Sequence, residues 1–310
     1  MKLTDAVAKL EGRGHRAAAV PVGRLSELRD HYERLSRRGV IDWQFARELL
    51  SGLTLLAPDG ASPSGSLVVV ATRDRIVSCA FGWRGAVVEV PVPPTYLHLR
   101  RKSREAALEL AELLPRGVRT ECIINAPHKL LAVRSGLARY GRNNITYIPG
   151  LGSFYWLTTV YADLPCDGGE WLEPSMMPAC EGCTRCAASC PTGAIPDDRF
   201  LLRAELCVTY WNEKPGDEPF PAWLAGSAHN CLMGCLRCQL VCPENQAVLG
   251  EAETGPSFAE DETKILLRGR EPEDLPEVLR AKLEEWDLLE WASLLPRNLA
   301  VHLPGAGGEA

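Results

Sequence analysis

The sequence C-E-G-C-T-R-C-A-A-S-C-P runs from Cys180 to Pro191, and C-L-M-G-C-L-R-C-Q-L-V-C-P follows it from Cys231 to Pro243. Closely spaced cysteines that end in a Cys-Pro pair are typical of proteins that hold two iron-sulfur clusters. In such proteins the last cysteine of each run binds the other cluster, so the two runs form one unit. The stretch from Cys180 to Cys242 therefore predicts electron transfer.

The spacing of the cysteines predicts two sets of cluster ligands. One set consists of Cys180, Cys183, Cys186 and Cys242, and the other of Cys190, Cys235 and Cys238 with either Cys207 or Cys231. The spacing leaves the choice between Cys207 and Cys231 open, although Cys231 lies four residues before Cys235 rather than three. Cys-x-x-Cys pairs also occur in structural zinc sites, but such sites need neither the further cysteine nor the proline. The prediction is two 4Fe-4S clusters.

Composition indicates a globular chain of several packed units. The 310 residues are 46% hydrophobic and include 12 cysteines. No apolar run is long enough to span a bilayer, and charged residues interrupt the first 22 residues before a signal sequence could form. We therefore expect a cytoplasmic protein without a membrane partner, whose thiols are reduced or bound to metal.

Charge is distributed unevenly along the chain. Residues 1–165 carry 23 Lys and Arg against 15 Asp and Glu, whereas residues 251–310 carry 6 against 14. A basic N-terminal part can attract anionic ligands, but an acidic C-terminal part repels a polyanion. Charge alone therefore gives little support for nucleic-acid binding.

Hydrophobic periodicity predicts an α+β fold with three segments. Helices are expected within residues 1–50 and over 95–114, 129–140, 275–286 and 291–299. Strands are expected over 67–71, 76–81, 86–92, 119–124, 143–147 and 154–161, with a loop over 250–262. The predicted domains are residues 1–165, a two-cluster segment at 166–250, and a short acidic helical tail at 251–310.

Residues outside the cysteine runs carry a family resemblance. They are L-A-V-R-S-G-L-A-R-Y-G-R-N-N at 131–144, L-G-S-F-Y-W-L at 151–157 and A-D-L-P at 162–165. With the two cysteine runs behind them, over residues 120–246, they make the chain resemble epoxyqueuosine reductases and, more distantly, corrinoid reductive dehalogenases.

The resemblance implies a nitroreductase-like N-terminal domain that binds cobalamin, followed by a ferredoxin-like domain whose two clusters reduce the cobalt. It assigns the open ligand position to Cys207, because the family has a cysteine in the pattern R-x-x-x-C-x-x-Y, here Arg203 to Tyr210. It also implies an external electron donor of the ferredoxin or flavodoxin type and a small-molecule or modified-nucleoside substrate. The expected corrinoid contacts are Arg134, Gly136, Gly141, Asn143, Asn144, Gly152 and Ser153.

Two departures from the family pattern affect the predicted function. The family's D-S-A-P segment, with its proton-donating Asp, is I-N-A-P-H-K here, so Asn125 and His128 are the candidate catalytic residues. The helical repeats that bind tRNA in the family are nearly absent after Cys242. We predict an iron-sulfur reductase related to epoxyqueuosine reductase. The alternative is a non-catalytic iron-sulfur electron carrier or partner protein that has lost corrinoid binding.

Overall fold

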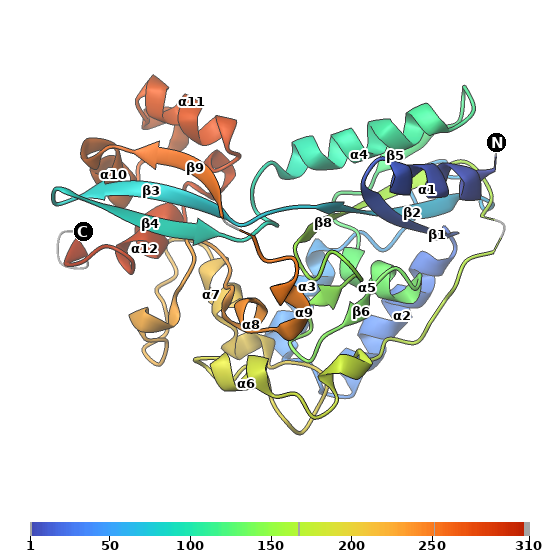
Figure 1. Ribbon diagram of the computed structural model, residues 1–310, viewed down its shortest axis with the longest axis horizontal. Helices are drawn as coiled ribbons and strands as arrows, with labels where there is room; N and C mark the ends of the chain where they lie inside the picture. Colours follow the sequence, from blue (N-terminus) through green and yellow to red (C-terminus); the bar gives the residue numbers. More distant parts are fainter. Residues whose placement is uncertain (1, 167, 251, 307–310) are drawn as a thin grey trace.

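The larger of two main sheets lies in the N-terminal half of the chain (Figure 1). A computed structural model describes residues 2–166, 168–250 and 252–306. The sheet is antiparallel with strand order β1-β2-β8-β5, formed by β1 (His15–Pro21), β2 (Ser66–Arg73), β8 (Tyr155–Ala162) and β5 (Thr120–Cys122). The apolar run at the centre of β2 is fully buried, as expected for a strand covered on both faces.

Helices cover both faces of this sheet. Leu10 of α1 (Leu3–Gly12) and Leu110 of α4 (Leu99–Leu113) pack against Val68 and Val70 on one face. The opposite face carries Leu67 and Val69, which pack with α2 (Arg24–Arg37), α3 (Trp43–Gly52) and α5 (His128–Arg134). Successive residues of β2 thus serve opposite cores, because side chains alternate across a strand.

The second sheet joins distant parts of the sequence. Its strand order is β4-β3-β9, with β3 (Val77–Trp83), β4 (Ala86–Val92) and β9 (Glu253–Phe258). β3 and β4 form a hairpin whose turn, Arg84-Gly85, has positive φ at both residues. β9 pairs with β3 in parallel, and the register shifts between Ser78 and Ala80, opposite the part of β9 that contains Pro256. Proline donates no backbone hydrogen bond, so an irregularity there is expected.

Hydrophobic cores cross the predicted segment boundaries. One cluster joins Phe81 and Leu97 with Leu232 of the cysteine-rich segment and with residues from Phe258 to Ala306. The tail contributes α10 (Glu260–Leu267), α11 (Glu277–Glu285) and α12 (Leu295–Ala300) to this core. The domain boundaries at residues 165 and 250 stay a prediction from the sequence. One hydrophobic cluster contains residues of all three segments, so they pack against one another.

The cysteine-rich segment is built from very short helices. They are α6 (Arg185–Ser189), α7 (Val208–Asn212), α8 (Arg237–Leu240) and α9 (Pro243–Gln246), with 3-10 turns at Pro178–Cys180, Ala204–Leu206 and Gly226–Ala228. Further 3-10 turns lie in the tail at Pro272–Asp274 and Leu289–Trp291. The mixed α+β class is confirmed. Among the described residues, no helix is long and apolar enough to cross a membrane.

Three expectations about elements are wrong. The helix predicted over 129–140 ends at Arg134 because Gly136 turns the chain with φ +76, and β6 (Arg139–Tyr140) then pairs with β7 (Thr146–Tyr147). The loop predicted over 250–262 contains β9 and the start of α10, and residues 1–50 include β1.

We predict that Gly255→Ala weakens the pairing of β9 with β3. A Cβ at Gly255 would lie 2.5 Å from Val77 Cγ1 and 2.8 Å from the Ser78 carbonyl oxygen. Overpacking of this kind costs about 1–3 kcal/mol, so the melting temperature should fall. Gly12→Ala is the matched control, because no atom lies within 4 Å of its added Cβ. Equal melting temperatures for the two variants, measured by anaerobic thermal unfolding, would contradict this account of β9.

Candidate iron-sulfur centre

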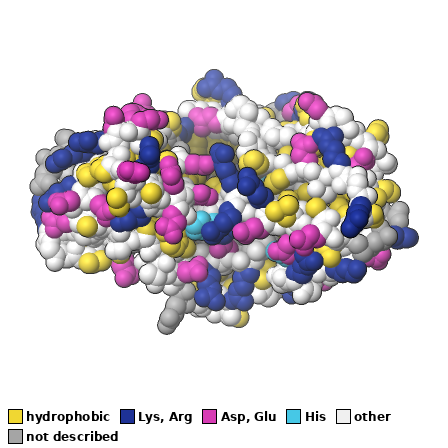
Figure 2. All heavy atoms as spheres, turned by 90° about the horizontal axis from the view of Figure 1, so that it is seen from above, with side chains coloured by type: hydrophobic (Ala, Val, Ile, Leu, Met, Phe, Trp, Pro, Cys, Tyr) yellow, Lys and Arg dark blue, Asp and Glu magenta, His cyan; other side chains and the backbone are white. Residues whose placement is uncertain are grey.

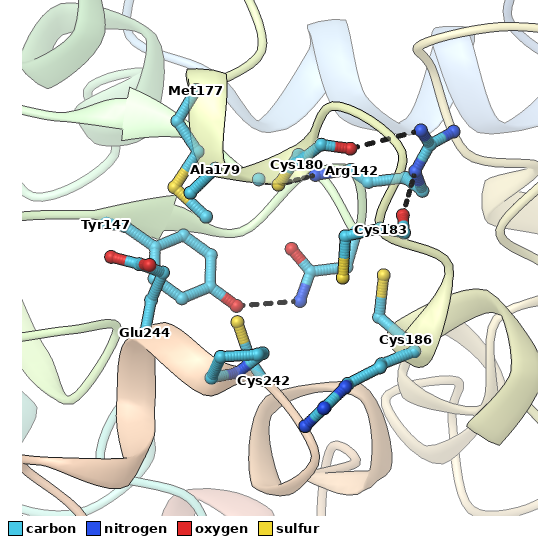
Figure 3. Close-up of a pocket in the computed structure, with 13 residues that line it drawn as sticks. Arg142, Tyr147, Met177, Ala179, Cys180, Cys183, Cys186, Cys242 and Glu244 are labelled. Carbon is cyan, nitrogen blue, oxygen red and sulfur yellow. Dashed lines mark hydrogen bonds between the residues drawn. The ribbon is translucent and has the colours of Figure 1, made fainter.

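Four cysteines line one small pocket between the cysteine-rich segment and the N-terminal half. They are Cys180, Cys183, Cys186 and Cys242, and Figure 3 shows their side chains around a common space. The first three come from the turn before α6 and from α6 itself. Cys242 arrives from the other run, directly before Pro243, which begins α9. The structure thus brings together the first predicted ligand set.

The thiols of this pocket lie in a weakly solvated environment. Burial raises the pKa of Cys186 to about 11, and nearby cysteines contribute in the same direction. Burial also raises the pKa of Cys180, although the backbone N–H of Arg142 opposes the shift by donating to Cys180 Sγ at 3.4 Å. Cluster ligands are thiolates, so iron must displace the protons of these thiols when a cluster assembles.

A second set of cysteines interacts around the beginning of α8. Burial raises the pKa of Cys235 to about 11, and the neighbouring thiols of Cys207 and Cys190 add to the shift. Burial likewise raises the pKa of Cys238, with further contributions from Cys235 and Cys207. The structure therefore places Cys190, Cys207, Cys235 and Cys238 within electrostatic reach of one another, which fits the second predicted ligand set.

Cys231 has the surroundings of a core residue. Its side chain is fully buried and packs in an apolar cluster with Phe154 and Leu236, while its thiol lies 3.6 Å from Asn230 Oδ1. This environment fits its predicted role as the spare cysteine.

Within the parts of the chain that the structure describes, no three Cys, His, Asp or Glu side chains are grouped so that they could hold a single metal ion.

The turn at 141–147 lies against the cysteine pocket. Arg142 binds the carbonyl oxygens of Cys183 at 2.9 Å and Cys180 at 3.2 Å, while Asn143 and Tyr147 line the pocket wall. Sequence analysis missed Arg142 and Tyr147. Arg142 stands within the family-like G-R-N-N stretch, which was a usable signal, whereas nothing in the sequence distinguishes Tyr147.

A buried polar network joins the 152–153 turn to α8 and α9. Asn245 Oδ1 accepts from the Ser153 backbone N–H at 2.8 Å, and its Nδ2 donates to Ser153 Oγ and to the Gln239 carbonyl oxygen. Ser153 Oγ in turn donates to Gln239 Oε1 at 2.8 Å. Gly152 has φ +57, and a Cβ there would lie 2.4 Å from Asn245 Oδ1. Only glycine permits this close approach.

The other residues predicted to contact a corrinoid also have protein partners. Asn144 binds the backbone of Phe200 and Leu202. Arg134 is buried and donates to the Leu172 carbonyl oxygen and to Glu173. Gly136 lies against the same connecting segment, because its Cβ would meet Glu170. These contacts pack the N-terminal half against residues 170–202.

The predicted corrinoid contacts have protein partners at two places. Five of them lie at the seam with the cysteine-rich segment, namely Gly141, Asn143, Asn144, Gly152 and Ser153. Arg134 and Gly136 lie at the 170–173 connection. The glycines and amides at the seam make close packing contacts and hydrogen bonds between protein segments, and their assignment to a corrinoid stays a prediction.

The two candidate catalytic residues differ in how strongly they are held. His128 is tied at both ring nitrogens, with Nδ1 2.8 Å from Thr159 Oγ1 and Nε2 2.8 Å from the Ile124 carbonyl oxygen. Burial lowers its pKa, so the ring is neutral near pH 7 and anchors the turn before α5. Asn125 is exposed on that turn, and its backbone oxygen accepts from Thr54 N–H.

Two charged residues that were not predicted, Lys129 and Glu213, lie beside the second set of cysteines. Both are exposed, and they interact with each other and with Cys207, which is near enough to influence the pKa of Lys129. Loss of solvent around them lowers the pKa of Lys129 and raises that of Glu213. Tyr96 donates a hydrogen bond to the Glu213 carboxylate.

We predict that Cys207→Ala loses the second cluster and that Cys231→Ala retains both. Cys207 interacts with three other cysteines of its set, whereas Cys231 lies in an apolar core and interacts with Cys235. Anaerobic iron analysis should show a fall from about eight irons per chain to about four for Cys207→Ala, because each cluster holds four irons. The reverse pattern would overturn the ligand assignment.

We expect Asn245→Ala to destabilise the seam. It removes three hydrogen bonds of a fully buried side chain and leaves the Ser153 N–H without its acceptor. A buried donor left without its partner costs about 1–3 kcal/mol. Gln246→Ala is the control, since Gln246 is exposed. Denaturant unfolding should separate the two variants, and equal midpoints would contradict a stabilising role for the network.

Comparison with known proteins agrees with the cysteine geometry. Residues 179–245 match the family model of the 4Fe-4S double cluster binding domain. Epoxyqueuosine reductase of Xanthomonas campestris pv. campestris is 30% identical over 244 residues, which are 73% of this chain and 63% of that protein. The enzyme of Burkholderia pseudomallei is 34% identical over 122 residues, or 37% of this chain and 29% of the relative. The chain thus spans less than two thirds of the length of these relatives.

Solved structures show the same fold. Epoxyqueuosine reductase from Bacillus subtilis aligns with 99% of this chain and 83% of its own, with a TM-score of 0.65 and 18% identity. A reductive dehalogenase aligns with 75% of this chain and 32% of its own, with a TM-score of only 0.38 and 16% identity. The chain is therefore similar in sequence and in fold to the epoxyqueuosine reductases, with a double-cluster segment in its C-terminal half.

Proposed function

We propose that the protein is an iron-sulfur reductase that resembles epoxyqueuosine reductase. The observation that carries the proposal is the meeting of cysteines from both runs in one pocket, walled by the 141–147 turn of the N-terminal half. The eight proposed ligands are Cys180, Cys183, Cys186, Cys190, Cys207, Cys235, Cys238 and Cys242. Two 4Fe-4S clusters held there would supply single electrons. The cytoplasmic location stays a prediction from the sequence.

The surface around Lys129 and Glu213 is the proposed place of reduction. It lies beside Cys207, a proposed ligand of the second cluster, so an acceptor bound there would be close to the electron source. Its two charged residues come from both halves of the chain, from α5 and from the residue after α7. A nitroreductase-like N-terminal domain and cobalamin remain part of the proposal, although the seven residues first assigned to the corrinoid do not support it.

Reduction also consumes protons, and the surface around Lys129 and Glu213 contains groups that can hold them. Glu213 accepts a hydrogen bond from Tyr96 and is drawn towards its neutral, protonated form by burial. Lys129 opposes that effect through its positive charge. A carboxyl with a raised pKa is suited to general acid catalysis near neutral pH. Glu213 is thus a better proposed proton donor than His128, whose ring nitrogens are both engaged.

The substrate class proposed from the relatives is a modified nucleoside or a similar small molecule. One solved epoxyqueuosine reductase is in complex with an epoxyqueuosine-modified tRNA stem loop. This chain carries an excess of acidic residues over 251–310, which disfavours contact of that part with a polyanion. An external donor of the ferredoxin or flavodoxin type would supply the electrons.

The proposal predicts the metal content of anaerobically purified protein and its response to cobalamin. About eight irons per chain and stoichiometric corrinoid uptake, followed by reduction of epoxyqueuosine as nucleoside or in a stem loop, support the corrinoid-dependent reductase. Reduction of the substrate without corrinoid uptake shows that the substrate is the direct acceptor. Eight irons with neither activity nor uptake support the electron-carrier alternative. Zinc without iron would overturn both.

A further inference from the structure

Two polar side chains of the N-terminal half lie between the two sets of cysteines. Asn143 and Tyr147 are 3% and 5% exposed, and Asn143 Nδ2 donates to the Tyr147 hydroxyl oxygen at 3.0 Å. Both residues line the pocket of Cys180, Cys183, Cys186 and Cys242. Polar side chains that are buried this deeply normally have hydrogen-bond partners. Their other contacts therefore indicate the role of these two side chains.

Each of the two side chains also interacts with one cysteine. Figure 3 shows the Tyr147 hydroxyl oxygen beside the sulfur of Cys242, and the two groups affect each other's ionisation, raising the pKa of Tyr147. The Asn143 side chain lies near enough to Cys238 to oppose the rise in the pKa of that thiol. Cys242 belongs to the first ligand set and Cys238 to the second. A chain of polar contacts, with the Asn143–Tyr147 hydrogen bond at its centre, therefore runs from Cys238 to Cys242.

The orientation of the Asn143 amide is fixed by the turn itself. Its Oδ1 accepts from the Ile145 backbone N–H at 3.2 Å, so its NH2 group must face the hydroxyl and the thiols. Gly141 makes room for this arrangement, since a Cβ there would lie 2.6 Å from both Asn143 Oδ1 and Tyr147 Cε2. The turn thus presents donors, and no acceptors, to the cysteine sulfurs.

We propose that Asn143 and Tyr147 form a hydrogen-bonded bridge between the two clusters and raise the reduction potential of both. This inference rests on the proposed function, because it requires the clusters to be bound. A cluster gains negative charge when it is reduced, and donors to its ligand sulfurs stabilise that charge. Tyr147 acts on the first cluster through Cys242, and Asn143 acts on the second through Cys238. Both are positioning residues that act through the ligands.

The bridge also explains why the N-terminal half contributes to a cluster site at all. The cysteine runs supply the ligands, but they do not supply these donors. The G-R-N-N stretch adds them, and Arg142 contributes a third donor through its backbone N–H to Cys180 Sγ. The potentials of the clusters would therefore be set by the same segment that packs the two halves together.

The test is a redox titration of the anaerobic, cluster-loaded protein, followed by electron paramagnetic resonance. Tyr147→Phe should move the first cluster to a lower potential and leave the iron content unchanged. Asn143→Ala should lower the potential of both clusters, because it removes the donor to Cys238 and the partner of Tyr147. Tyr155→Phe is the matched control, since Tyr155 is 4% exposed and its hydroxyl donates to Thr146 Oγ1 at 2.7 Å.

The outcomes separate this inference from the proposed function. Unshifted potentials in both variants at full iron content, or an equal shift in Tyr155→Phe, would overturn the bridge and leave the reductase proposal standing. Wild-type protein without iron would overturn both. The Tyr147→Phe variant could lose its first cluster, and the test then rests on the second cluster of Asn143→Ala. A lower potential of that cluster supports the bridge, and an unchanged potential refutes it.

Discussion

The structure depends on burying cysteine sulfurs that must become negatively charged. Desolvation raises the pKa of Cys186, Cys235 and Cys238, so the protein alone favours neutral thiols in both sets. Iron, by contrast, requires thiolates, and the bound metal must compensate for their charge. The cysteine-rich segment has only short helices and small apolar clusters of its own. Metal binding would therefore supply much of the cohesion that a larger core supplies elsewhere.

The N-terminal half supports this segment through polar contacts at the seam. Ser153, Gln239 and Asn245 form a buried network, and Lys214 binds Glu48 of α3 at 2.8 Å. Such contacts are directional, so they specify one relative position of the two halves more strictly than apolar packing would. The second sheet adds a hydrophobic connection, because β9 returns after the cysteines to pair with β3. The cysteine-rich segment is thus held on two sides.

The cluster ligands could be predicted from the sequence because their spacing is a local property. Strands β2 and β8 could be predicted for the same reason, since β2 has a continuous apolar run and β8 is rich in aromatic and β-branched residues. The pairing of β9 with β3 could not, because it joins residues far apart in the chain and β9 contains Gly255 and Pro256. Those two residues normally indicate a loop, and tertiary pairing overrides that tendency.

The sequence indicates which family-like residues matter, but it does not indicate what each of them contacts. Gly152 and Asn143 belong to stretches that set this chain apart from a simple ferredoxin, and sequence reasoning assigned them to an organic cofactor. The structure shows instead that Gly152 permits contact with Asn245 and that Asn143 faces Tyr147. Glycine and asparagine suit either role, because both permit close approach and hydrogen bonding. The two roles can be told apart only when the neighbouring segment is known.

The missing carboxylate has a counterpart beside Lys129. The 124–128 turn carries Asn125 and a firmly held His128, whereas Glu213 of the cysteine-rich segment interacts electrostatically with Lys129 of α5. An acid in that position would deliver its proton from the same side as the electrons. Its hydrogen bond from Tyr96 also links it to the core of the second sheet, to which Tyr96 belongs. Under the proposed function, proton and electron supply would therefore depend on the same packing between the two halves.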